Sequence, residues 1–170
     1  MYCQVDRKNG RISVTNCGRT MLNKMLHAAD GLMVNENGKI VLIQRKGVTF
    51  HNFWALPGGT VDEGETIEEA LIREMKEEAG VDVDPKEILG VFSDPDRDPR
   101  GRVISTVFIC DYKGKLKAGS DAGRIITCTL EKALEMQLAF DHNFILQCYQ
   151  QWLENKATFW SKKGIMTLKS

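Results

Sequence analysis

The chain has 170 residues, 42% hydrophobic and 27% charged, which is ordinary for a single soluble globular domain. Lys plus Arg and Asp plus Glu both number 23, so the zero net charge gives no reason to expect a nucleic-acid or membrane partner. No apolar run approaches the roughly 20 residues that span a bilayer, and the five scattered cysteines form no C-x2-C pair, which predicts a cytoplasmic protein without a zinc site.

Residues 1–24 are predicted to be an N-terminal extension that contains a hairpin. Residues 4–6 and 11–14 read as short strands, and they flank Asn9-Gly10, a pair typical of two-residue hairpin turns. The main domain is expected over residues 25–156.

The main domain begins with two apolar runs, residues 26–34 and 40–44. Asn35-Glu36-Asn37-Gly38-Lys39 separates them, which predicts a second hairpin. Arg45 closes the second run. From its position alone it is a strand end in water.

Residues 51–59 bring aromatic residues next to glycines. Phe53 and Trp54 either complete the core or stack on a base, and Phe53 is a candidate substrate contact. Gly58 and Gly59 follow, and without a Cβ they let a ligand approach the backbone closely.

Residues 66–80 predict a helix with both ends marked. Thr66 and Glu69 form a capping box, and Gly80 stands where a glycine ends a helix. An apolar stripe at about four-residue spacing runs between them, made by Ile67, Leu71, Met75 and Ala79.

Three carboxylates, those of Glu74, Glu77 and Glu78, fall off this stripe on adjacent turns. A solvated face is one interpretation. In a partly dehydrated cleft, however, two carboxylates about 4 Å apart repel by about 4 kcal/mol at an effective dielectric near 20. A hard divalent cation reverses the sign of that interaction, so the spacing indicates a candidate metal site.

The segment 59–81 matches the Nudix box, G-x5-E-x7-R-E-U-x-E-E-x-G-U with U apolar, position for position. The chain therefore resembles the Nudix hydrolases, which cleave nucleoside diphosphates linked to another moiety and use Mg²⁺ or Mn²⁺. The matching residues are Gly59, Glu65, Arg73-Glu74-Met75, Glu77-Glu78 and Gly80-Val81.

The resemblance implies roles for these residues. The Gly59 carbonyl, Glu74, Glu77 and Glu78 would hold the metal. Glu74 and Glu78 would be catalytic, with Glu74 orienting or deprotonating the water. Arg73 does not deprotonate in proteins, so it is expected to pair with Glu65 or a neighbouring residue and hold the loop against the helix. The resemblance also implies a phosphate contact for Arg45 and, since many similar enzymes are dimers, a homodimer.

Beyond a strand over residues 88–93, the loop 94–102 alternates acids and arginines around two prolines. Its charges either pair with each other in water or grip a substrate. The sequence S-x-P-x-R-D-P-R-G resembles the ADP-ribose pyrophosphatase branch of the Nudix family. That interpretation gives diphosphate oxygens to the arginines and ribose hydroxyls to the acids. The candidates are Asp96, Arg97, Asp98 and Arg100.

The remaining domain is read as strands over residues 103–112 and 125–130, a short helix over 131–136, and a last helix capped by Asp141. Related sequences read roughly D-A-x-E near Asp121, whereas this chain has Arg124 there. The downstream carboxylate is therefore missing or moved, which leaves the general base open. Residues 157–170 are predicted to be a tail, in which Phe159 and Trp160 could dock on a partner.

Together these features predict an α/β fold, a Nudix-type α/β/α sandwich with a mixed β-sheet. The expected activity is Mg²⁺-dependent hydrolysis of a small-molecule nucleotide, ADP-ribose above others, to AMP and ribose 5-phosphate. Two alternatives stay open. One is a pyrophosphohydrolase that removes damaged nucleoside triphosphates, and the other is a module that senses ADP-ribose without cleaving it.

Overall fold

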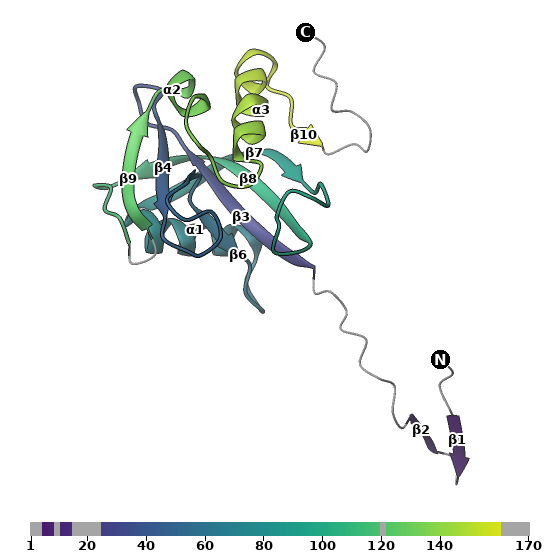
Figure 1. The fold of residues 1–170 in the computed structure, drawn as a ribbon. Coiled ribbons are helices and arrows are strands. Elements are labelled where there is room, and N and C mark those ends of the chain that lie inside the picture. Colours follow the sequence, from purple (N-terminus) through teal and green to yellow (C-terminus); the bar gives the residue numbers. More distant parts are fainter. Residues whose placement is uncertain (1–4, 9–10, 15–24, 120–121, 161–170) are drawn as a thin grey trace.

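A computed structural model describes residues 5–8, 11–14, 25–119 and 122–160, with side chains from residue 25 onward. Within these ranges, none of the helices combines the length and the hydropathy that a bilayer crossing requires. The elements in chain order (Figure 1) are β1 (Val5–Lys8), β2 (Arg11–Val14), β3 (Leu26–Met33), β4 (Ile40–Arg45), β5 (Trp54–Ala55), β6 (Gly58–Thr60), α1 (Ile67–Ala79), β7 (Asp82–Phe92), β8 (Val103–Lys113), β9 (Ala122–Cys128), α2 (Leu130–Leu134), α3 (His142–Asn155) and β10 (Phe159–Trp160).

Two sheets form the centre of the domain. The larger has the order β10-β7-β8-β3-β6 and is mixed, because β3 pairs parallel with β8 while β6 and β7 pair antiparallel with their neighbours. The smaller sheet, β5-β4-β9, is antiparallel. Strands β1 and β2 pair antiparallel with each other, as the N-terminal hairpin requires.

Helices cover both faces of this centre (Figure 1). Helix α1 lies on one face, where Leu71 and Met75 pack against Ala29 and Phe108. Helices α2 and α3 lie on the other, where Ile145 and Trp152 belong to a core cluster shared with the strands. The predicted α/β/α sandwich with a mixed sheet is confirmed.

The predicted hairpin over residues 26–44 was wrong in its pairing. The turn forms, with Asn35 Oδ1 accepting hydrogen bonds from the backbone N–H groups of Asn37 and Lys39. However, β3 and β4 meet only at the Val34–Ile40 bridge and then enter different sheets. Both edges of β3 are occupied by β8 and β6, so none is left for β4.

Strand β7 begins at Asp82, six residues before the predicted start at residue 88. The charged residues and Pro85 concealed the strand in the sequence, since proline removes a ladder donor. The pairing with β8 continues through them because the register shifts between Pro85 and Glu87, as at a β-bulge.

The predicted C-terminal tail contributes the short strand β10. Phe159 pairs with Gly90 of β7, and its ring stacks on Phe92 with the centroids 4.8 Å apart. A side chain at position 90 would collide with Phe159, which explains the glycine. Phe159 thus docks on its own chain, whereas Trp160 is 64% exposed. Residues 161–170 lie outside the described ranges.

The start of α3 is tied to the segment between β5 and β6. His142 is 3% exposed, and its Nδ1 accepts a hydrogen bond of 3.0 Å from the backbone N–H of Leu56. This bond requires the proton of the neutral ring to sit on Nε2. Burial lowers the pKa of His142 to about 4.

The first prediction is that His142 makes the protein sensitive to acid. Its pKa is near 6.5 in the unfolded chain and about 4 in the folded protein, so only the unfolded chain gains this proton as the pH falls between these values. The folding free energy should weaken by up to about 3 kcal/mol over that window. Urea unfolding at a series of pH values measures the loss.

The comparison variant is His142→Asn, which keeps an acceptor for the Leu56 N–H but does not titrate. It should be less stable at pH 7 and lose less stability between pH 7 and 4. His51→Gln, at an exposed histidine, serves as the matched control. An acid slope in His142→Asn equal to that of the wild type would refute the assignment.

Candidate active site

A cavity of about 600 Å³ opens where β3, β6 and α1 meet the loop 94–102 and the segment before α3. Charged groups of both signs line it. The carboxylates are those of Asp30, Glu74, Glu78 and Asp98, and the guanidinium groups are those of Arg45, Arg97 and Arg100. The cavity can therefore hold an anion and a cation side by side.

Two glycines let α1 approach the strand that precedes it. The Gly58 N–H donates to Glu78 Oε2 at 2.9 Å. A side chain at Gly59 would overlap the Glu74 carboxylate. The glycines seen in the sequence thus bring backbone against the two carboxylates of the helix.

Helix α1 has the caps that the sequence predicts. Thr66 and Glu69 form the capping box, and Gly80 ends the helix with a φ of 71°. Leu71, Met75 and Ala79 are buried. With this face fixed, Glu74 and Glu78 come to lie at the cavity.

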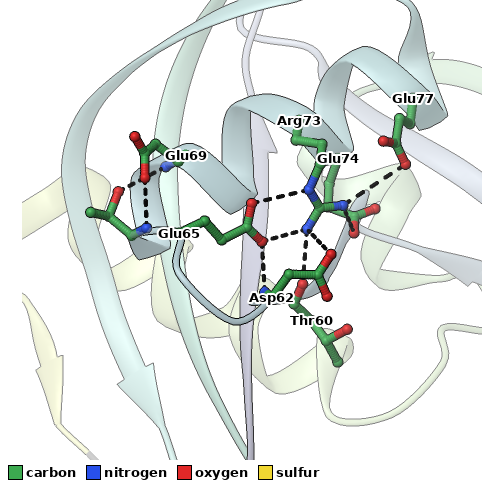
Figure 2. A network of polar contacts seen from close by, with 8 residues as sticks. Thr60, Asp62, Glu65, Glu69, Arg73, Glu74 and Glu77 are labelled. Atoms are coloured by element: carbon green, nitrogen blue, oxygen red, sulfur yellow. Dashed lines mark hydrogen bonds and ion pairs between the residues drawn. The ribbon is translucent and has the colours of Figure 1, made fainter.

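Arg73 joins the loop before α1 to the helix and to β6 (Figure 2). Its Nε and Nη2 bind the two carboxylate oxygens of Glu65 at 3.1 and 2.6 Å, and Nη2 also donates to the Thr60 carbonyl at 3.0 Å. Its Nη1 lies 2.6 Å from Glu74 Oε1. The expected pairing with Glu65 is present. The Arg73 bonds lower the pKa of Glu65 and raise that of Arg73.

Glu74 and Glu78 have raised pKa values, because burial and neighbouring like charges disfavour the ionised carboxylate. Burial, followed by the charges of Glu74 and Asp30, raises the pKa of Glu78 to about 8, against the lowering effect of the Gly58 N–H. Burial also raises the pKa of Glu74. Glu77 differs, because its side chain is 62% exposed, outside the cavity lining, and 3.8 Å from Arg73.

The donor set fits a hard divalent cation. In the described part of the chain, no three side chains of His, Cys, Asp or Glu converge closely enough to hold a metal as they lie. Glu74 and Glu78 nevertheless present oxygen ligands whose mutual repulsion and desolvation a cation would offset. Burial is the largest cause that raises the pKa of both carboxylates.

The loop 94–102 is held by its own ion pairs. Arg97 is buried and binds Asp141 through two bonds of 2.9 and 2.7 Å. Asp98, also buried, holds Arg100 with a shortest bond of 2.7 Å. Both arginines and Asp98 line the cavity, whereas Asp96 is exposed and outside it.

These pairs change two expectations from the sequence. Asp141 occupies the N-cap position of α3, but its side chain makes no capping hydrogen bond, because the carboxylate binds Arg97 instead. The Asp98 carboxylate, expected to be offered to a ribose hydroxyl, is already engaged by Arg100.

The aromatic residue that lines the cavity is Phe140, whereas Phe53 is outside the lining. Phe53 packs beside Phe50 in a small apolar cluster. Phe140 has a φ of 54°, a backbone conformation that nothing in the sequence indicated. Its place in the cavity could therefore not be predicted from the sequence.

Asp30 was missed as well, although a signal existed. It is a single carboxylate inside the apolar run that became β3, and only 7% of it is exposed. The Ser105 hydroxyl donates to it, and burial raises its pKa. A charged residue in a buried strand is rare enough to mark a candidate site.

Arg124, near the start of β9, is exposed and is not part of the cavity lining. Asp121, the other carboxylate considered there, lies outside the described residues. The predicted loss or shift of the downstream carboxylate therefore stays a prediction.

Comparisons with known proteins identify the family of this chain. The NUDIX domain model matches residues 25–148. The chain is 51% identical over 126 residues to the ADP-ribose pyrophosphatase of Methanocaldococcus jannaschii, covering 74% of this chain and 73% of the relative. It is 31% identical over 125 residues to the ADPR responsive transcriptional repressor NtrR of Acinetobacter baylyi, covering 71% of this chain and 50% of that protein.

Among solved structures, a bifunctional NMN adenylyltransferase/ADP ribose pyrophosphatase from Francisella tularensis superposes with a TM-score of 0.64 at 28% identity. The match covers 79% of this chain and 42% of that one, so the second protein extends well beyond the shared domain. Since the family model and the 51% identical relative both span most of the chain, the protein belongs to the Nudix family of hydrolases.

Proposed function

We propose that this Nudix hydrolase cleaves ADP-ribose to AMP and ribose 5-phosphate. The observation that carries the proposal is that carboxylates and guanidinium groups line one cavity. A diphosphate needs both, a cation bound by carboxylates and arginines for its outer oxygens. The 51% identical relative bears the name of this activity.

In the reaction, a water oxygen attacks one phosphorus of the diphosphate. The bond between that phosphorus and the bridging oxygen breaks, and the water contributes one hydrogen-bearing oxygen to the new phosphate. Mg²⁺ or Mn²⁺ held by the Gly59 carbonyl, Glu74 and Glu78, with Glu77 at the outer edge, would supply charge neutralisation and a more acidic water. Glu74 would orient or deprotonate the water.

Arg73 and Glu65 would act by position. The Arg73 fork binds one oxygen of Glu74, a residue that lines the cavity, and so restrains this carboxylate. Arg45 and Arg100 would bind the phosphate oxygens. Arg97 would act indirectly, because Asp141 already occupies its fork.

The ADPR-responsive repressor among the relatives keeps a second candidate, a module that binds ADP-ribose without turnover. The chain retains Glu65, Arg73, Glu74, Glu77 and Glu78. Loss of one of these would be the simplest route to a pure sensor, so their presence favours the hydrolase.

The second prediction concerns Glu78→Gln. The change removes an ionisable carboxylate at constant size, so kcat should fall by about two orders of magnitude or more, while the metal-free protein melts at the same or a higher temperature. Mg²⁺ should raise the Tm of the wild type by mass action and have little effect on the variant. Initial rates and thermal melts with and without Mg²⁺ measure both effects.

The pH dependence provides a second readout for Glu78. Because its pKa is about 8 in the folded protein and near 4.5 when unfolded, the stability of the metal-free wild type should fall as the pH rises through that window. This slope should shrink in Glu78→Gln and persist in Glu68→Gln, a control on the exposed first turn of α1. Strong metal-free destabilisation of Glu78→Gln with full activity would show a structural role instead.

The third prediction is that Arg73→Lys keeps the fold and loses rate. Lysine carries the charge but lacks the planar fork that contacts Glu65, Glu74 and Thr60 together. We expect kcat to fall by about 10- to 100-fold, the usual cost of losing a group that orients a metal ligand. Circular dichroism and Tm report the fold, and full activity in the variant would mean that the fork is dispensable.

The fourth prediction tests substrate choice. The wild type should have a higher kcat/KM for ADP-ribose than for a deoxynucleoside triphosphate. Arg100→Ala should cost about 1–3 kcal/mol in transition-state binding, the scale of a charge-assisted hydrogen bond, and more on ADP-ribose than on the triphosphate. Arg124→Ala, at an exposed arginine outside the cavity, is the matched control. A wild-type preference for the triphosphate would overturn the ADP-ribose assignment.

A further inference from the structure

Two guanidinium groups from distant parts of the chain lie over the ring of Phe140. Cζ of Arg45, at the end of β4, lies 4.8 Å from the ring centroid. Cζ of Arg100, in the loop 94–102, lies 4.9 Å from the same centroid. Both distances fall within the range of an attractive cation–π contact.

Each arginine donates a hydrogen bond through its Nε atom. Arg100 is fixed at one edge, where Nε and Nη2 both donate to Asp98. Arg45 donates through Nε to the Thr49 carbonyl at 3.3 Å. Among the hydrogen bonds and ion pairs of the described residues, the two terminal nitrogens of Arg45 take no part, so they are available to a ligand in the cavity that Arg45 lines.

Two like charges close together need compensation. After burial, the charge of Arg100 is the largest influence that lowers the pKa of Arg45. The carboxylates of Glu78, Asp98 and Asp30 act on Arg45 from a distance, but none forms an ion pair with it within the described part of the chain. An anion that touches both guanidinium groups would provide the missing compensation.

Phe140 itself is firmly placed. Its ring meets Phe50 edge-on with the centroids 4.8 Å apart and lies 5.4 Å from His142. The residues on either side are anchored, Ala139 by a backbone bond to Trp54 and Asp141 by Arg97. The ring is thus a fixed surface, and its backbone keeps a φ of 54° that side-chain-bearing residues seldom adopt.

We propose that Phe140 is a positioning residue that holds Arg45 and Arg100 on one ring as a two-cation clamp for the two phosphates of a diphosphate. The identity of that diphosphate as part of ADP-ribose rests on the proposed function. The clamp itself requires only that the ligand carry two linked phosphoryl groups. The shared ring offsets part of the repulsion between the two guanidinium groups, because each makes an attractive contact with it.

The test is the binding of inorganic pyrophosphate to the full-length, metal-free protein, measured by isothermal titration calorimetry. Phe140→Leu removes the aromatic face but keeps a Cβ, so the backbone demand at position 140 stays the same. Its affinity for pyrophosphate should fall about tenfold, as expected for losing two cation–π contacts. Phe140→Tyr keeps the face and should bind within about twofold of the wild type.

Phe144→Leu is the matched control, because Phe144 also packs against other rings but carries no guanidinium. It should lower the Tm to a similar extent as Phe140→Leu and leave pyrophosphate affinity unchanged. Orthophosphate, with a single phosphoryl group, should lose less affinity than pyrophosphate in Phe140→Leu.

The results separate the clamp from the proposed function. Unchanged pyrophosphate affinity in Phe140→Leu, or an equal loss in Phe140→Tyr, would overturn the clamp even if the wild type hydrolyses ADP-ribose. A wild type that fails to hydrolyse ADP-ribose, combined with the expected pyrophosphate pattern, would overturn the substrate and support the clamp for another diphosphate.

Discussion

The ion pair between Arg97 and Asp141 is the interaction on which the basic side of the cavity depends. It joins two segments 44 positions apart, and only 4% of the Arg97 side chain and 17% of the Asp141 side chain are exposed. Leaving one partner of such a buried pair alone typically costs about 3–5 kcal/mol. The pair fixes the loop 94–102 against the start of α3, and Asp98, Arg100 and Phe140 take their places from it.

The acidic side is organised by a different arginine. Arg73 joins β6, the loop before α1 and the helix (Figure 2), and it binds Glu74 although Arg73 itself is not part of the cavity lining. The two sides thus have separate supports, one local in sequence and one distant. The two sets of charges still act on each other: burial raises the pKa of Asp30 and of Glu78, and the charge of Arg45 opposes that rise at both.

What the sequence predicted well was local. The capping box of Thr66 and Glu69, the terminal Gly80 and the apolar stripe all act within a few residues, so their spacing carries the information. Arg73 pairs with Glu65, which lies eight positions earlier, in the loop that leads into the same helix. The placement of Glu74 and Glu78 at the cavity needed only this helix and the two glycines before it.

What the sequence could not predict depends on partners far along the chain. Nothing near Arg97 indicates Asp141, and therefore a buried structural arginine looked like a candidate phosphate ligand. The separation of β3 from β4 depends on β8 and β6 occupying both edges of β3. Phe140 was overlooked because its importance comes from two arginines, 95 and 40 positions away by the residue numbers, that meet on its ring.

The backbone around this ring also bears on how the protein could be engineered. Among the described residues, the non-glycine positions with positive φ are Phe50, Asn52, Phe140 and Lys156, and the rings of the first and third of these touch. A left-handed residue costs about 1–2 kcal/mol relative to glycine, so a search for thermostable variants would favour glycine or asparagine at these positions. Such variants would gain robustness by giving up a surface shaped for a ligand. Residues 50 and 140 are therefore the positions that a stabilisation programme should exclude from its library.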